Sequence, residues 1–289
     1  MSPLPVWIHE MVVAPSAFAL SFLHARRAVG AWRAAGELLA LAAYGYALEA
    51  VAIQLFGSHT YGTGWHVAPG GVPVAVALVW SALISSAMAL AARSGWQGAG
   101  ARAVAAALIA TTLDVLMEPV AVRSGLWRWT PAGPWLGVPI GNFVGWAVIV
   151  AGYTLGAERF AGEGPPAREA AIRLVVAAGS LLALVAVGLA WRMLGLERLF
   201  TGARGWVAWA AVLLGAAAVP RARAADAPGD GLAARLGRAP GKLPSAVFLG
   251  VAAVFAVDAA LLRDARLGLI AVASLLALAR ISGRASSGS

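Results

Sequence analysis

Asp114 and Glu118 are two carboxyl groups four residues apart within an apolar stretch of the chain. That spacing places them on one face of a helix, with Cβ atoms about 5 to 6 Å apart. Burial and like charge both favour the protonated form, so one carboxyl should keep its proton near neutral pH and be available as a general acid. The other could remain an anion that stabilises a cation or accepts a proton. The alternative is a structural role, in which both accept hydrogen bonds from Trp or Arg neighbours.

Few other ionisable residues lie inside apolar stretches. A charge at the centre of a membrane span costs about 2.5 to 3.5 kcal/mol on insertion scales, so each needs a reason. Glu10, Glu49 and Asp258 are further candidates, and Glu49 is the strongest of them. Glu37 and Glu158 lie near the ends of such stretches, where we expect water to solvate them.

Transmembrane helices must carry these residues. Of the 289 residues, 61% are hydrophobic and 12% are charged, whereas a soluble domain has about 25% charged residues. About 20 helical residues cross the hydrocarbon core, where a helix satisfies its own backbone hydrogen bonds. The fold class is therefore all-α, a polytopic transmembrane bundle of seven to nine spans. Apolar windows lie at 5–23, 36–56, 72–92, 103–122, 138–157, 172–194, 206–220, 245–262 and 267–281.

The alternating direction of successive helices brings the candidate residues to one side of the membrane. Residues late in even-numbered spans and early in odd-numbered spans share a level. This group comprises His9, Glu10, Glu49, Asp114, Glu118, Asn142 and Asp258. Two connections carry polar and aromatic residues and open on the same side; these residues are His59, Tyr61, Trp65, His66, Trp127 and Trp129.

Two of these tryptophans, Trp127 and Trp129, admit two interpretations. Indole rings are enriched at membrane interfaces because they are amphipathic. Alternatively, their faces could stabilise a carbocation by cation–π attraction, worth about 2 kcal/mol when desolvated. Cysteine is absent and the four histidines are scattered, so we expect no metal site, and no nucleotide-binding motif is present.

Charge and chain ends indicate orientation. We expect residues 1–282 to form one integral membrane domain, 283–289 a disordered tail and 221–244 a flexible loop. The net charge of +9 is dispersed through short connections, which argues for topology signals and against nucleic acid. Most of the 22 Lys and Arg residues fall on connections opposite the N-terminus. The N-terminus should therefore lie outside, with the protein in a bacterial inner membrane; the oligomeric state is unknown.

Linked motifs resemble the membrane carotenoid hydratase family, which includes γ-carotene 1'-hydratase and bisanhydrobacterioruberin hydratase. The resemblance covers about residues 40–155. The first residue that carries the resemblance is Glu49, and the last motif ends at Trp146. The motifs are 57–65 (GSHTYGTGW), 72–80 (VPVAVALVW), 113–121 (LDVLMEPVA), 125–129 (GLWRW) and 137–146 (GVPIGNFVGW). The chain departs from the family at Tyr61-Gly-Thr-Gly-Trp65, where Gly-x-Tyr-x-Tyr is expected.

The resemblance implies a cofactor-independent hydratase acting on a carotenoid end group, with substrate entering from membrane lipid and water as second reactant. Asp114 or Glu118 would protonate the terminal C=C bond. The other carboxyl, with Glu49, would stabilise the tertiary carbocation or activate water. Side chains expected to bind the end group or orient the water are His59, Tyr61, Trp65, Trp127, Trp129, Asn142 and Trp146.

Two other functions remain open. The family is distantly similar to membrane lycopene cyclases, which also protonate a terminal alkene but exclude water, so the product could be a ring. A proton-coupled transporter is a different class, in which Glu49, Asp114 and Glu118 would form a proton relay.

Overall fold

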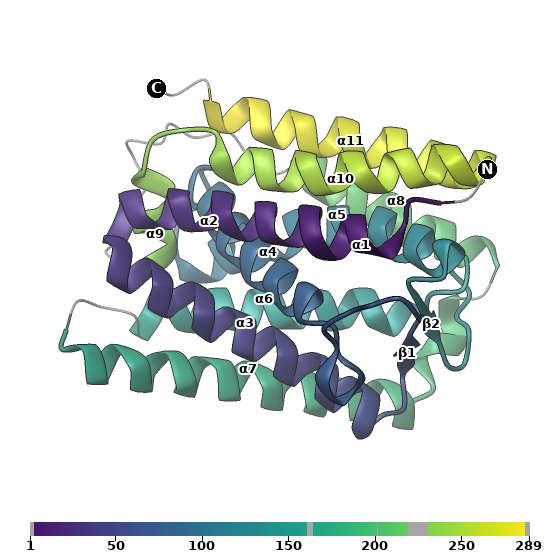
Figure 1. The fold of residues 1–289 in the computed structure, drawn as a ribbon, viewed down its shortest axis with the longest axis horizontal. Helices are drawn as coiled ribbons and strands as arrows, with labels where there is room; N and C mark the ends of the chain where they lie inside the picture. The colour runs from purple at the N-terminus through teal and green to yellow at the C-terminus, as the bar shows by residue number, and fades with distance from the viewer. Residues whose placement is uncertain (1–2, 161–163, 201, 219–230, 287–289) are drawn as a thin grey trace.

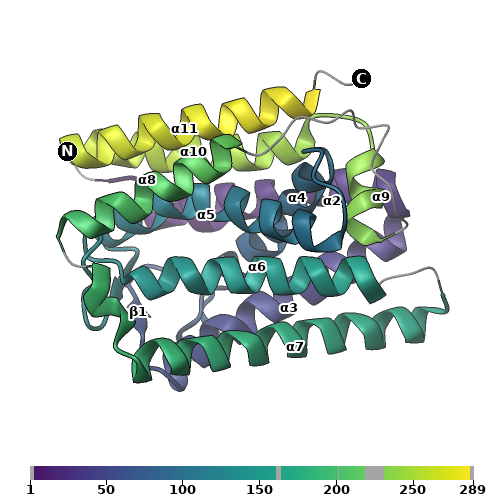
Figure 2. The same ribbon diagram turned by 180° about the vertical axis from the view of Figure 1, so that it is seen from behind.

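The structure, a computed structural model, describes residues 3–160, 164–200, 202–218 and 231–286. Its long helices run side by side along one axis (Figures 1 and 2). Within the described residues, eight helices are long and apolar enough to cross a membrane. The prediction of an all-α polytopic bundle is therefore confirmed, and the chain is an integral membrane protein.

Each predicted apolar window coincides with one continuous helical segment. The first is built from α1 (Val6–Ile8), the π-helix η1 (His9–Val13) and α2 (Ala14–Val29). The others are α3 (Ala31–Gln54), α4 (Val74–Ala92), α5 (Ala99–Ser124), α6 (Ile140–Phe160), α7 (Pro166–Met193), α8 (Ala203–Ala218), α10 (Leu243–Leu262) and α11 (Ala265–Ser286). Among these, α8 has 16 residues and is shorter than a full span; positions 219–220 of its window lie outside the described residues.

Two segments predicted to be irregular are partly helical. The predicted loop 221–244 contains α9 (Leu232–Arg238), while 221–230 lie outside the described residues. Leu232, Ala233 and Leu236 are buried, so neighbouring helices supply the apolar surface that stabilises α9. Of the predicted tail 283–289, residues 283–286 belong to α11, and 287–289 lie outside the described residues.

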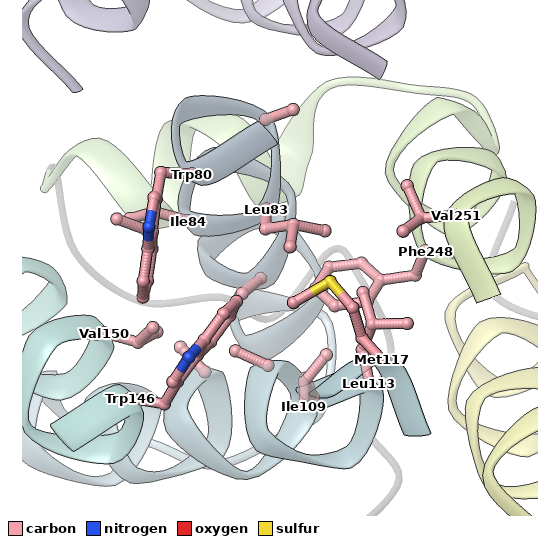
Figure 3. Packing of buried hydrophobic residues seen from close by; sticks show 14 of the residues in the cluster. Trp80, Leu83, Ile84, Ile109, Leu113, Met117, Trp146, Val150, Phe248 and Val251 are labelled. Atoms are coloured by element: carbon pink, nitrogen blue, oxygen red, sulfur yellow. The ribbon is translucent and has the colours of Figure 1, made fainter. Parts of the chain in front are cut away.

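The core forms around α4 and α5, the two most buried spans. Both helices are rich in Ala, Ser and Thr, small residues that let membrane helices approach closely. Figure 3 shows Leu83 of α4 and Leu113 of α5 within this packing. Trp80 of α4 stacks on Trp146 of α6, with ring centroids 4.0 Å apart and planes inclined by 28°. This indole pair forms part of the boundary between core and site.

The two ends of the bundle carry different elements. Two short strands, β1 (His59–Tyr61) and β2 (Trp127–Trp129), lie at one end, and α9 lies at the other (Figure 1). We call these the strand end and the α9 end. At the α9 end, the Arg93 guanidinium donates hydrogen bonds to the carbonyl oxygens of Gly237, Ala239 and Gly241, which fastens α9 to α4.

The prediction that Glu37 and Glu158 are solvated is wrong. Glu37 is 4% exposed and accepts hydrogen bonds from Tyr153 at 2.7 Å and from Arg173 at 2.8 Å. Glu158 pairs with Arg102 and accepts the backbone N–H of Ala234 at the start of α9. Each carboxyl is paired with an arginine from another helix, and these partners take the place of water.

Close approach of α3 and α4 is required at Gly45, because a Cβ there would lie 2.5 Å from the Cβ of Trp80. We expect Gly45→Ala to destabilise the protein by about 1 to 3 kcal/mol, the usual cost of overpacking. Gly250→Ala in α10 is the matched control, since nothing lies within 4 Å of its added Cβ. Thermal unfolding in detergent measures both; equal shifts would show that the α3–α4 contact is not tight.

Candidate active site

The site is organised by antiparallel pairing of β1 with β2. His59 pairs with Trp129, and Tyr61 pairs with Trp127. Successive strand residues point to opposite faces, so these four rings share one face while the intervening Thr60 is exposed. The ring centroids of His59 and Trp129 lie 4.8 Å apart. Pairing of two connections far apart in the sequence thus gathers the aromatic side chains.

Two indoles hold the carboxyl of Glu118. Trp127 Nε1 donates to Glu118 Oε2 at 2.9 Å, and Trp129 Nε1 donates to the same oxygen at 2.8 Å. Glu118 lies on α5, and only 5% of it is exposed. Both indole N–H groups therefore point inward to a carboxyl, and these tryptophans do not act as a simple interfacial belt.

Glu49 is held in a comparable way from α3. Its Oε1 accepts a hydrogen bond from Trp80 Nε1 at 2.7 Å, and its Oε2 lies 3.0 Å from His59 Nε2. Ser58 Oγ lies 2.9 Å from the other ring nitrogen of His59, Nδ1. Each oxygen of Glu49 thus has a nitrogen partner from a separate element.

Asp114 lies one turn before Glu118 on α5 and is fully buried. Its Oδ2 accepts a hydrogen bond from Asn142 Nδ2 at 3.2 Å, which joins α5 to α6. Among the described residues, Oδ1 has no hydrogen-bond partner. α5 runs through Pro119 without ending, so both carboxyls stay on one continuous helix.

A cavity of about 580 Å³ opens between these groups. Glu49 and Glu118 line it from different helices. Of the side chains predicted for the site, Asp114 alone is outside the lining; the others in it are His59, Tyr61, Trp65, Trp127, Trp129, Asn142 and Trp146. The structure thus brings nearly the whole predicted set to one cavity.

Sequence reasoning missed two contributors to the cavity. Trp80 donates a hydrogen bond to Glu49, although the sequence shows it only as the last residue of a motif. Glu197 accepts the backbone N–H groups of Ile140 at 2.7 Å and Gly141 at 3.0 Å, and so caps the N-terminus of α6. It also accepts a hydrogen bond from Trp191. No local pattern signals a capping residue more than fifty positions away.

Glu10 and His66 are at the strand end but outside the cavity lining. Glu10 accepts hydrogen bonds from the backbone N–H groups of His66 and Val67, at 2.8 to 3.0 Å, and lies 2.7 Å from His66 Nδ1. The pair therefore fastens the first span to the connection that carries β1.

The electrostatics of the strand pair favour a charged His59 and a neutral Tyr61. Burial alone would lower the pKa of His59, but the hydrogen bond to Glu49 and the negative charge of Glu49 outweigh it and raise the pKa. Burial, followed by the charge of Glu49, raises the pKa of Tyr61 well above its usual value. Tyr61 thus remains a hydrogen-bond donor.

This shift predicts a pH-dependent stability. A histidine whose pKa is raised by folding contributes stability that is complete below its unfolded pKa, about 6.5, and is lost as the pH rises through the folded value. We expect the thermal midpoint of wild type to fall over that interval relative to His59→Gln, which lacks the titrating group. Unfolding in detergent at a series of pH values measures the difference; a constant difference would contradict the prediction.

Comparison with known proteins agrees with the motifs. A family model described as carotenoid biosynthesis protein matches residues 8–204, a longer segment than the 40–155 covered by the motifs. No curated protein and no solved structure has significant similarity to the chain. The matched segment includes Glu49, Glu118 and both strands, and it covers more than half of the chain. The chain therefore belongs to the carotenoid biosynthesis protein family.

Proposed function

We propose that this protein is a carotenoid hydratase that adds water across the terminal C=C bond of an acyclic end group. One observation carries the proposal beyond family membership: Glu118, buried among indole rings, lines a cavity with largely apolar walls. An isolated alkene is a weak base, so its protonation requires a strong acid away from bulk water. A buried carboxyl that keeps its proton meets this requirement.

The reaction balances without a cofactor. The Glu118 proton bonds to the less substituted alkene carbon through the π electron pair, leaving a tertiary carbocation and a carboxylate. Water forms a C–O bond to the cation and loses one proton, which restores the Glu118 carboxyl, and the product is a tertiary alcohol. Since Oε2 of Glu118 already accepts two indole N–H groups, Oε1 is the oxygen that carries the proton.

The two remaining carboxyls have different roles in this scheme. Asp114 lies outside the cavity lining, so we assign it to holding Asn142, which does line the cavity. Glu49 stabilises the cation as an anion. Asn142 and Tyr61 orient the water.

Aromatic side chains complete the end-group pocket. The faces of the indoles offer cation–π stabilisation of the charged intermediate, worth about 2 kcal/mol when desolvated. Rings that line the cavity include those of Trp65, Trp127, Trp129, Trp146 and His59.

Membrane lipid supplies the substrate in this proposal. We infer that the strand end faces the outer side of a bacterial inner membrane, and the excess of basic residues opposite the N-terminus supports this orientation. Water then reaches the cavity from that side, while the carotenoid enters from the hydrocarbon phase.

Pigment analysis after co-expression with a lycopene- or γ-carotene-producing pathway tests the function. A product heavier than its precursor by one water supports hydration, and the mass should rise only when this protein is present. A coloured isomer of unchanged mass would instead identify a cyclase. Unchanged pigment would refute both and favour a transport role for the buried carboxyls.

A further inference from the structure

His9 and Asp258 form a histidine–carboxyl pair beside the cavity, in addition to the pair of His59 and Glu49. His9 lies in η1 and lines the cavity together with Val251 and Phe255 of α10. Asp258, also on α10, is fully buried, and His9 is 6% exposed. α10 lies outside the segment matched by the family model, so this wall is contributed by the C-terminal part of the chain.

The local backbone explains why His9 reaches this position. Pro15 has no N–H group and cannot bond to the carbonyl of residue 11, and the preceding turn instead adopts the wider π-helical pattern, with Ala14 N–H bonded to the His9 carbonyl. Single-turn π-helices occur frequently at functional sites. The imidazole ring of His9 packs 5.3 Å from the ring of Phe255.

The geometry of the pair leaves hydrogen-bonding capacity unused. His9 Nε2 lies 3.1 Å from Asp258 Oδ2, but within the described chain neither atom has a hydrogen bond of normal alignment. Asp258 Oδ1 accepts the backbone N–H of Leu4 at 2.6 Å, which fixes the carboxyl. Because Nε2 faces Asp258, Nδ1 is the nitrogen left for a molecule in the cavity.

We propose that His9 is the base of the hydration step and that Asp258 is its positioning residue. The inference rests on the proposed hydratase function. Water bound at His9 attacks the tertiary carbocation, its oxygen forms the C–O bond, and one of its protons passes to the imidazole. That proton then returns through water to Glu118, which closes the cycle. Asp258 orients the ring and stabilises the imidazolium.

Contrasts within the protein support this assignment. Glu49 is the other candidate base on the cavity, but both of its oxygens already have nitrogen partners. His24, the other buried histidine of the first span, lies 2.9 Å from the carbonyl oxygen of Leu236 at the α9 end and does not line the cavity. Its setting is that of a structural histidine, whereas His9 combines a carboxyl partner with access to the cavity.

Deuterium labelling separates the base from the acid. Membranes are incubated in D₂O with lycopene, and both the hydrated product and the deuterium in recovered lycopene are measured. Without the base, Glu118 still forms the cation, which loses a proton and returns as labelled alkene. We expect His9→Gln and Asp258→Asn to lower hydrated product at least about tenfold, since general bases contribute about 10²- to 10⁴-fold. Deuterium in recovered lycopene should persist, whereas Glu118→Gln should lose both signals.

Glu10→Gln is the matched control, because Glu10 neighbours His9 and anchors the same span but does not line the cavity. This variant should keep the wild-type ratio of hydrated product to deuterium in recovered lycopene. Asp258→Asn retains the oxygen that accepts the Leu4 N–H, so it guards against a folding defect in His9→Gln. Wild-type hydration by His9→Gln, or parallel loss of product and exchange in Asp258→Asn, would overturn the inference. Absence of hydration by wild type would instead refute the hydratase function.

Discussion

Glu118→Gln is expected to slow carotenoid conversion by about 10²- to 10⁴-fold, the range contributed by a general acid. Glutamine has nearly the same shape, and its carbonyl oxygen can still accept the indole N–H groups of Trp127 and Trp129. It cannot donate a proton of carboxylic-acid strength. The measurement is the initial rate of product formation in membranes containing equal amounts of enzyme.

Two comparisons sharpen this experiment. Glu169→Gln removes a carboxyl of α7 that pairs with Arg33 of α3 and Arg173 of α7. Glu169 is outside the cavity lining, so the variant should keep a rate close to that of wild type. Asp114→Asn should reduce the rate less than Glu118→Gln, because Asp114 acts through its neighbour. Full activity in Glu118→Gln would exclude this residue as the acid.

Glu49→Gln is expected to lower the saturating rate by about 10²-fold or more, as for removal of a preorganised group that stabilises transition-state charge. The substitution removes the negative charge near the developing cation. Since the charge matters in the transition state and little in the bound neutral substrate, kcat should fall while KM changes little. Rates over a series of substrate concentrations in detergent–lipid micelles distinguish the two parameters.

Spectroscopy of the same Glu49→Gln variant tests whether a change in packing explains the effect. Glutamine at position 49 keeps an oxygen for the Trp80 N–H, so the Trp80–Trp146 stack should persist. Near-ultraviolet circular dichroism, which reports on tryptophan packing, should therefore resemble that of wild type. An unchanged kcat with a raised KM would show that Glu49 only binds substrate.

The positions of the helices along the chain, and the end of the bundle at which the candidate residues lie, follow from the sequence. The reason is that each membrane span must satisfy a requirement on its own residues. A helix must be apolar over about 20 residues to cross the membrane, and that pattern is readable without knowledge of neighbours. Alternation of direction then places Glu49 and Glu118 near the same end. The family motifs add most of the aromatic rings that the structure gathers around the cavity.

Pairings between elements depended on the tertiary structure. The sequence contains no local signal that His59 meets Glu49, that Glu37 and Glu158 are buried against arginines, or that Asp258 reaches His9. Such contacts depend on which helices are neighbours and how each is rotated, and both are set by packing of small residues along whole helices. The sequence by itself therefore determined where each helix lies along the chain, because the membrane requires an apolar pattern there. Helix packing decided which carboxyl faces the cavity and which residues surround it.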